Sequence, residues 1–152
     1  MSLIPHLGDG YEKLPAILDQ FAKELLPAKE QFSNDGKLLE NCLSKNSALM
    51  HYYDERRIRL HTLVKFFKME KERVQSNLFK KYNENYSRDL GLQLIAKYVA
   101  SEDEYIFVGK LALEVEELYE EYVSVVDTFK QRHYELTNMT KLRIANLEFS
   151  EI

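Results

Sequence analysis

Proline and glycine almost vanish from this chain after residue 37, and their scarcity limits the possible folds more than any other feature. The sequence holds three prolines and five glycines in total. From Lys37 onward it has no proline, and its only glycines are Gly91 and Gly109. Because these residue types mark turns, the remaining ~115 residues predict a few long helices. An all-β fold would need many more turn signals, so we expect an all-α protein.

Hydrophobic periodicity predicts two long helices, one over about 38–81 and one from Ser101 onward. In both, apolar residues recur at spacings of three and four, as in the seam of a coiled coil. The first seam is interrupted by polar residues at Asn46, Arg57 and Lys71. Ser101 begins a capping box, the motif that starts many helices. At 1.5 Å per residue, each long helix would measure about 65 Å.

Two shorter helices are expected in the same chain. The first spans about 15–26, because Pro15 suits an early helical position and Pro27 limits the far end. The second spans about 88–99 and follows a polar break in the sequence.

The long seams also predict self-association. A compact domain of this length has a radius of gyration near ~15 Å, so two helices of ~65 Å cannot be covered by the ~60 residues that remain. We therefore expect the last helix to form the subunit contact. Its expected contact residues are Leu118, Tyr122, Val125, Phe129, Leu136 and Met139.

Residues 56–81 reverse the charge of an otherwise acidic chain. The whole chain has a formal net charge of −4, whereas this segment holds nine cations and two acids, a local balance of 9 − 2 = +7. Clustered cations attract a polyanion. Aromatic rings such as Phe66 and Phe67 offer faces on which unpaired bases can stack. The segment predicts binding of single-stranded nucleic acid; alternatively, it is a solvated face whose cations pair with acids on neighbouring helices.

Residues 102–121 form an acidic counterpart, with eight acids and one cation. Glu114, Glu117 and Glu121 share one helical face through their spacings of three and four. This face is either solvated, or paired with the basic segment, or a docking site for a basic partner protein.

No pattern of catalytic or metal-binding residues is present in the sequence. The four histidines lack metal-ligand spacing, and no Cys-x-x-Cys or Gly-rich phosphate loop occurs. The single cysteine, Cys42, cannot form an intrachain disulfide, which fits a reducing compartment. No apolar run approaches the ~20 residues of a membrane span, and the amino terminus lacks the features of a secretory signal. We expect a cytoplasmic protein that is not an enzyme and has no cofactor.

The order of these segments and two short motifs resemble the UvsY family, the recombination mediators of T4-like phages. The similarity covers about 38–152. One motif is Ala-Ser-Glu-Asp-Glu at 100–104, and the other is Gln-Arg-His-Tyr-Glu-Leu-Thr-Asn at 131–138. The chain departs from the family near the end of the first long helix, where Gln75 and Asn77 replace paired basic residues.

The resemblance implies a protein that binds single-stranded DNA as a ring-like homo-oligomer, with a heptamer as the family's example. Such proteins help to load the phage recombinase onto strands coated by the phage single-stranded DNA-binding protein, in the host cytoplasm and without a membrane partner. Residues 1–36 would then be an N-terminal segment with one short helix, and 37–152 a helical domain for DNA binding and oligomerisation. The expected DNA contacts are Lys68, Lys71, Arg73, Lys80, Lys81 and Tyr82.

Two other classes of protein fit the same seams and cations. A structural coiled-coil scaffold would have the long helices without strand binding. A BAR-like module would use cations on a long helical dimer to bind an anionic membrane surface.

Overall fold

The computed structural model describes residues 2–33, 36–85 and 91–150. Every regular element in these ranges is a helix, which confirms the all-α prediction. The elements are a 3-10 turn η1 (Ile4–His6) and the helices α1 (Leu14–Leu25), α2 (Ala28–Gln31), α3 (Leu39–Asn85), α4 (Leu92–Ser101) and α5 (Asp103–Ser150). No helix in the described ranges combines the length and the apolarity needed to cross a membrane.

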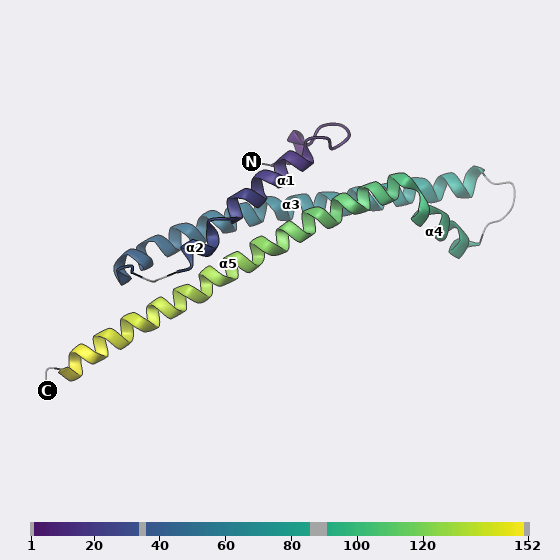
Figure 1. The fold of residues 1–152 in the computed structure, drawn as a ribbon. Coiled ribbons are helices and arrows are strands. Elements are labelled where there is room, and N and C mark those ends of the chain that lie inside the picture. Colours follow the sequence, from purple (N-terminus) through teal and green to yellow (C-terminus); the bar gives the residue numbers. More distant parts are fainter. Residues whose placement is uncertain (1, 34–35, 86–90, 151–152) are drawn as a thin grey trace.

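The two long helices, α3 and α5, lie side by side as an elongated antiparallel hairpin (Figure 1). Near one end, the Lys71 ammonium lies 5.4 Å from the centre of the Tyr105 ring. Near the other end, the Asn46 side chain donates a hydrogen bond to the Phe129 carbonyl at 3.2 Å. The helices contain 47 and 48 residues and are each about 70 Å long at 1.5 Å per residue.

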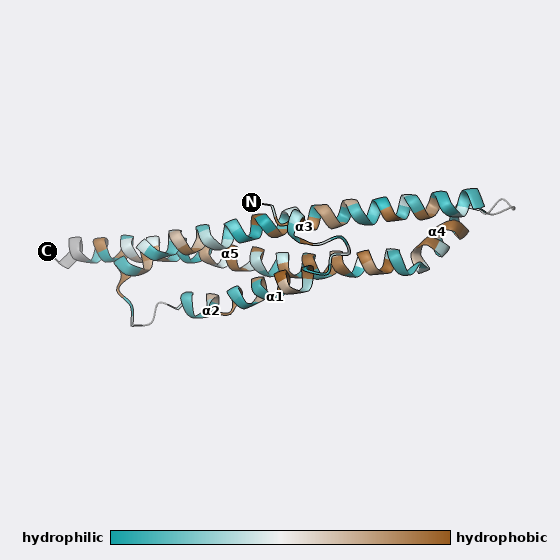
Figure 2. Ribbon diagram, turned by 90° about the horizontal axis from the view of Figure 1, so that it is seen from above, coloured by the Kyte–Doolittle hydropathy of each residue, from teal (hydrophilic) through white to brown (hydrophobic). Residues whose placement is uncertain are grey.

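An apolar core fills the space between the two long helices. Its largest fully buried side chains are the rings of Tyr53, Phe67, Tyr122 and Phe129. Burying one such side chain contributes on the order of 1.5–3 kcal/mol relative to leaving it in water. Colouring by hydropathy shows apolar residues along α5 and over most of α4 (Figure 2).

The helix α1 and the short α2 pack onto the hairpin and share its core. The Tyr122 hydroxyl donates to the Phe21 carbonyl of α1 at 2.8 Å, and the Tyr53 hydroxyl donates to Gln31 Oε1 of α2 at 3.0 Å. Burial raises the pKa of both tyrosines. The sequence pattern predicts α1 but not α2, since a four-residue helix is too short to show a period.

Most of the residues expected at a subunit contact are buried inside the single chain. Because α3 and α5 cover each other, the two long seams do not need a second copy to become buried. Val126, one residue beyond the predicted Val125, is the buried valine of its turn. In full, Leu118, Tyr122, Phe129 and Leu136 are buried, Val125 is half-buried against the core, and Met139 is 46% exposed.

Two predicted helix boundaries differ from the structure. The helix α3 continues to Asn85, four residues beyond the expected end at Lys81. The helix α5 begins at Asp103, because Glu102 is extended (φ −69°, ψ 134°) and separates α4 from α5. The Ser101 hydroxyl donates to the Tyr98 carbonyl within α4 at 2.9 Å, so the predicted start of α5 at Ser101 is wrong. The expected start of the short helix near residue 88 lies outside the described residues.

Candidate nucleic-acid interface

The basic segment lies entirely on α3, and three of its arginines are paired with acids of the same helix. In each pair the acid precedes the arginine by three or four residues, which places both side chains on one face. Exposed pairs of this kind contribute about 0–1 kcal/mol, but they partly neutralise the cation. The pairs are Arg57–Asp54 at 2.7 Å, Arg59–Glu55 at 3.5 Å and Arg73–Glu70 at 2.9 Å.

Arg56 instead connects α3 to α1. Its Nε lies 2.7 Å from Glu24 Oε2, and its terminal nitrogen bonds the other carboxylate oxygen. The same guanidinium lies 4.6 Å from the centre of the Phe21 ring. Burial alone would raise the pKa of Glu24, but the hydrogen bond and the charge of Arg56 outweigh burial and lower it. Arg56 thus stabilises the packing of α1 on α3. This agrees with the alternative interpretation of the basic segment, in which its cations pair with acids on neighbouring helices.

A second group of basic side chains lies on the side of α3 next to α5. We call it the His61 cluster: Arg57 and His61, which are half-buried, and Lys65 and Lys68, which are exposed. Burial, followed by the charges of Lys65, Arg57 and Lys68, lowers the pKa of His61. The His61 ring stacks on the Tyr119 ring of α5, with centroids 5.0 Å apart and an interplanar angle of 16°. The cluster therefore places two exposed lysines, which raise the local positive potential, beside two half-buried aromatic rings. Cations and aromatic rings are the two kinds of group that single-strand binding uses.

The structure brings one of the six expected DNA contacts, Lys68, into this cluster. Lys71 turns inward and lies over the Tyr105 ring of α5. Arg73 is exposed, and it bonds Glu70, whose carboxylate also accepts a hydrogen bond from Tyr11.

The other three expected contacts lie near the carboxyl end of α3. Lys80 and Lys81 are exposed, and Lys80 Nζ lies 3.9 Å from a Glu84 oxygen. The Tyr82 hydroxyl donates to Glu102, and its ring stacks on Tyr98 of α4 at 5.5 Å. At 3.6 residues per turn, Lys80 points about 120° away from Lys68 and lies about 18 Å along the axis from it. The six residues therefore do not form one continuous patch.

Sequence reasoning missed Arg57, His61 and Lys65 as site residues. A signal for them was present, because spacings of four place the three on one strip of a helix. The contribution of Tyr119 had no such signal, since it depends on which residue of α5 lies opposite His61.

The acidic face of α5 is exposed, as one of its three readings predicts. Glu114, Glu117 and Glu121 line an open groove of about 380 Å³ together with Asp19 of α1. Within the described ranges, no ion pair joins these glutamates to the basic segment of α3. The two charged faces are therefore separate surfaces of the molecule.

No group of three or more His, Cys, Asp or Glu side chains in the described part of the chain is placed to hold a metal ion. Compared with known proteins, the chain matches no family model, no curated protein and no solved structure. The resemblance to UvsY-like mediators stays a prediction, and any function must be argued from the surfaces described above.

Proposed function

We propose that this protein binds single-stranded DNA along the exposed basic side of α3 and acts as a recombination mediator. In that role a homo-oligomer loads a phage recombinase onto strands coated by single-stranded DNA-binding protein, and it catalyses no reaction. The observation that supports strand binding most directly is the His61 cluster, where two exposed lysines lie beside the stacked His61 and Tyr119 rings. The mediator role rests on the sequence resemblance.

Lysines bind phosphates, and the part of the His61 and Tyr119 rings that reaches solvent would contact an unpaired base. Such contacts are weak singly, and assembly into a ring would repeat them, so that effective concentration raises the overall affinity. The affinity for a single strand falls with a log–log slope of about 0.7 per phosphate neutralised. If each protomer engages about three phosphates, the affinity per subunit should fall roughly tenfold between about 50 and 150 mM salt.

Exposed apolar residues on the carboxyl half of α5 support the homo-oligomer. Met139, Leu142 and Ile144 are 46%, 65% and 53% exposed, and Tyr134 is exposed nearby. Leu142 and Ile144 lie on opposite sides of the helix, because two residues turn it by about 200°. Exposed apolar side chains concentrated in one stretch of a helix mark an interaction site. We propose that this part of α5, in place of the buried seam, makes the contact between subunits.

Fluorescence anisotropy with labelled oligo-dT tests the strand-binding proposal. The variant Lys65→Ala/Lys68→Ala should bind at least about tenfold more weakly than the unmodified protein, with a shallower salt dependence. The matched control is Lys130→Ala/Lys141→Ala, which removes two exposed lysines from α5. An equal loss in both variants would indicate attraction by overall charge, and no loss in either would place the strand elsewhere.

A sedimentation assay with anionic vesicles separates the two alternative classes. A BAR-like module would pellet with vesicles that contain phosphatidylserine, and the elongated hairpin with its cationic side suits such a surface. A coiled-coil scaffold would bind neither vesicles nor oligo-dT. Strand binding without vesicle binding is the result that the proposal expects.

A further inference from the structure

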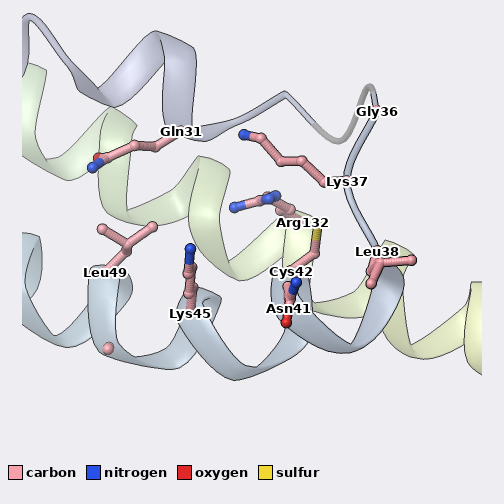
Figure 3. A pocket seen from close by; sticks show the side chains of 10 residues that line it. Gln31, Gly36, Lys37, Leu38, Asn41, Cys42, Lys45, Leu49 and Arg132 are labelled. Carbon is pink, nitrogen blue, oxygen red and sulfur yellow. The ribbon is translucent and has the colours of Figure 1, made fainter.

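A cavity of about 550 Å³ lies at the open end of the hairpin, where α2, the start of α3 and α5 meet (Figure 3). Three cationic side chains from separate parts of the chain line it. Lys37 comes from the loop before α3, Lys45 from α3 itself and Arg132 from α5. Figure 3 shows their nitrogen atoms directed toward the same space.

Two of the three cations are held by hydrogen bonds to neighbouring residues. Arg132 is 5% exposed, and its Nη1 donates to Asn46 Oδ1 at 3.3 Å. The Lys37 ammonium donates to the Ser33 carbonyl at 2.9 Å. Because the guanidinium is already positioned by packing, a ligand that it binds would lose little affinity to ordering this side chain.

The remaining wall is neutral. It combines the amides of Gln31 and Asn41 with apolar groups that include Leu38 and Leu49. No carboxylate belongs to the part of the cavity wall that the structure describes. The three cations are therefore the charged side chains of the described cavity wall.

We infer that this cavity binds a phosphate monoester of nucleotide size. The guanidinium of arginine and the ammonium of lysine both form charge-assisted hydrogen bonds to phosphate oxygens. The cavity volume falls within the range of about 300–1,000 Å³ that is typical of small-molecule sites, and the apolar wall would cover the non-phosphate part of the ligand. The monoester belongs either to a free nucleotide or to the 5′-phosphorylated end of a strand.

This site is separate from the strand-binding face proposed above. Lys45 and Lys68 lie on the same helix and are about 35 Å apart at 1.5 Å per residue. Loss of one site should therefore leave the other intact, and the two proposals can fail independently.

Isothermal titration calorimetry with adenosine 5′-monophosphate and with adenosine tests the inference. The nucleotide should bind at least about tenfold more tightly than the nucleoside, since its phosphate makes the charge-assisted hydrogen bonds. Lys37→Gln/Lys45→Gln should remove most of this preference without disturbing the fold, because both side chains are exposed. Lys130→Gln, outside the cavity, should bind as the unmodified protein does.

A short oligo-dT with a 5′-phosphate, compared with the same oligonucleotide carrying a 5′-hydroxyl, distinguishes the two sources. Tighter binding of the phosphorylated than of the 5′-hydroxyl oligonucleotide identifies strand ends, and equal binding of the two beside binding of adenosine 5′-monophosphate identifies a free nucleotide. The inference is overturned if neither binds at millimolar concentration, or if Lys37→Gln/Lys45→Gln binds both as well as the unmodified protein. Long 5′-hydroxyl oligo-dT should bind that variant with unchanged affinity, which keeps this test apart from the test of the α3 face.

Discussion

Among single side chains, His61 is the natural reporter of the charge on α3. Burial and three neighbouring cations lower its pKa below the ordinary value of 6.5. A phosphate bound at the His61 cluster would offset those cations, so the pKa of His61 should rise when oligo-dT is added. An NMR titration of the His61 ring, with and without the oligonucleotide, measures the change.

A variant supplies the internal control for this prediction. In the free protein, Lys65→Ala/Lys68→Ala should itself raise the pKa of His61, because two of the depressing charges are gone. If oligo-dT leaves the pKa of His61 unchanged in the unmodified protein, the strand does not lie at this cluster.

Glu24 makes stability depend on pH in the acid range. Its folded pKa lies below the ordinary 4.5, because Arg56 outweighs the opposing effect of burial. A depressed carboxyl pKa stabilises the fold above the unfolded value, and that contribution is lost as pH falls through the folded value. The free energy of unfolding, measured in urea from pH 7 to pH 3, should therefore fall below about pH 4.5.

The variant Glu24→Gln should be less stable at pH 7 and should lose less stability on acidification. Glu120→Gln, which removes an exposed carboxylate of α5, should keep the steeper decline. Identical pH profiles for Glu24→Gln and the unmodified protein would show that the pair with Arg56 does not stabilise the fold.

On the scale of helices, a buried polar contact fixes how α3 and α5 align. Asn46 is fully buried, donates to the Phe129 carbonyl and accepts from Arg132. Asn46→Ala should cost about 1–3 kcal/mol, because it leaves a buried carbonyl without this donor and removes a partner of the guanidinium. Urea unfolding measures the cost, and Ser47→Ala, at the exposed neighbouring position, should change stability by less than about 0.5 kcal/mol.

The two ends of the basic segment should differ in their contribution to strand binding. Lys65 and Lys68 share a side of α3 with Arg57, whereas Lys80 lies near Glu84 and opens onto another side. Lys80→Ala/Lys81→Ala should therefore weaken oligo-dT binding less than Lys65→Ala/Lys68→Ala does, with the mass of the assembly unchanged in both. The opposite order in anisotropy titrations would move the site to the carboxyl end of α3.

The sequence was sufficient to predict the long helices, but it did not show which helix packs against which. A seam such as Leu60, Val64 and Phe67 shows that one side of a helix is buried. The same apolar pattern occurs whether that side packs against another chain or against a helix of the same chain. The prediction that the seams need a second subunit assumed a compact domain, whereas the two long helices form a hairpin and bury their seams against each other. In the candidate site, the Arg57–Asp54 spacing was visible in the sequence. That Lys45 and Arg132 line one cavity was not visible, because they are 87 positions apart in the sequence.

For the molecule as a whole, self-association should depend on the exposed apolar residues near the carboxyl end of α5. Leu142→Glu/Ile144→Glu places one charge on each of two opposite sides of this part of α5 and should lower the mass of the assembly without unfolding the hairpin. Analytical ultracentrifugation measures the mass, and circular dichroism checks the helix content. Ser124→Glu/Thr128→Glu adds the same charges at exposed polar positions more than about 20 Å away along α5 and should leave the mass unchanged.

Point variants test assembly more sharply than a truncation does, because the end of α5 contributes residues to the core of the single chain. A truncation after Thr128 would remove Phe129 and Leu136, which are buried within one chain. Loss of assembly after such a truncation would then follow from loss of the fold. An unchanged mass for Leu142→Glu/Ile144→Glu would show that this surface does not join subunits.

The antiparallel pairing of α3 with α5 also sets an order of folding. Contacts near α4 join residues close in sequence, such as Lys71 and Tyr105, whereas those at the open end join Glu40 to Arg143. The entropy lost on closing a loop grows with its length, so we expect the hairpin to close first beside α4 and to zip toward the open end. The cavity lies where the zipping finishes, so a nucleotide bound there would slow the first step of unfolding.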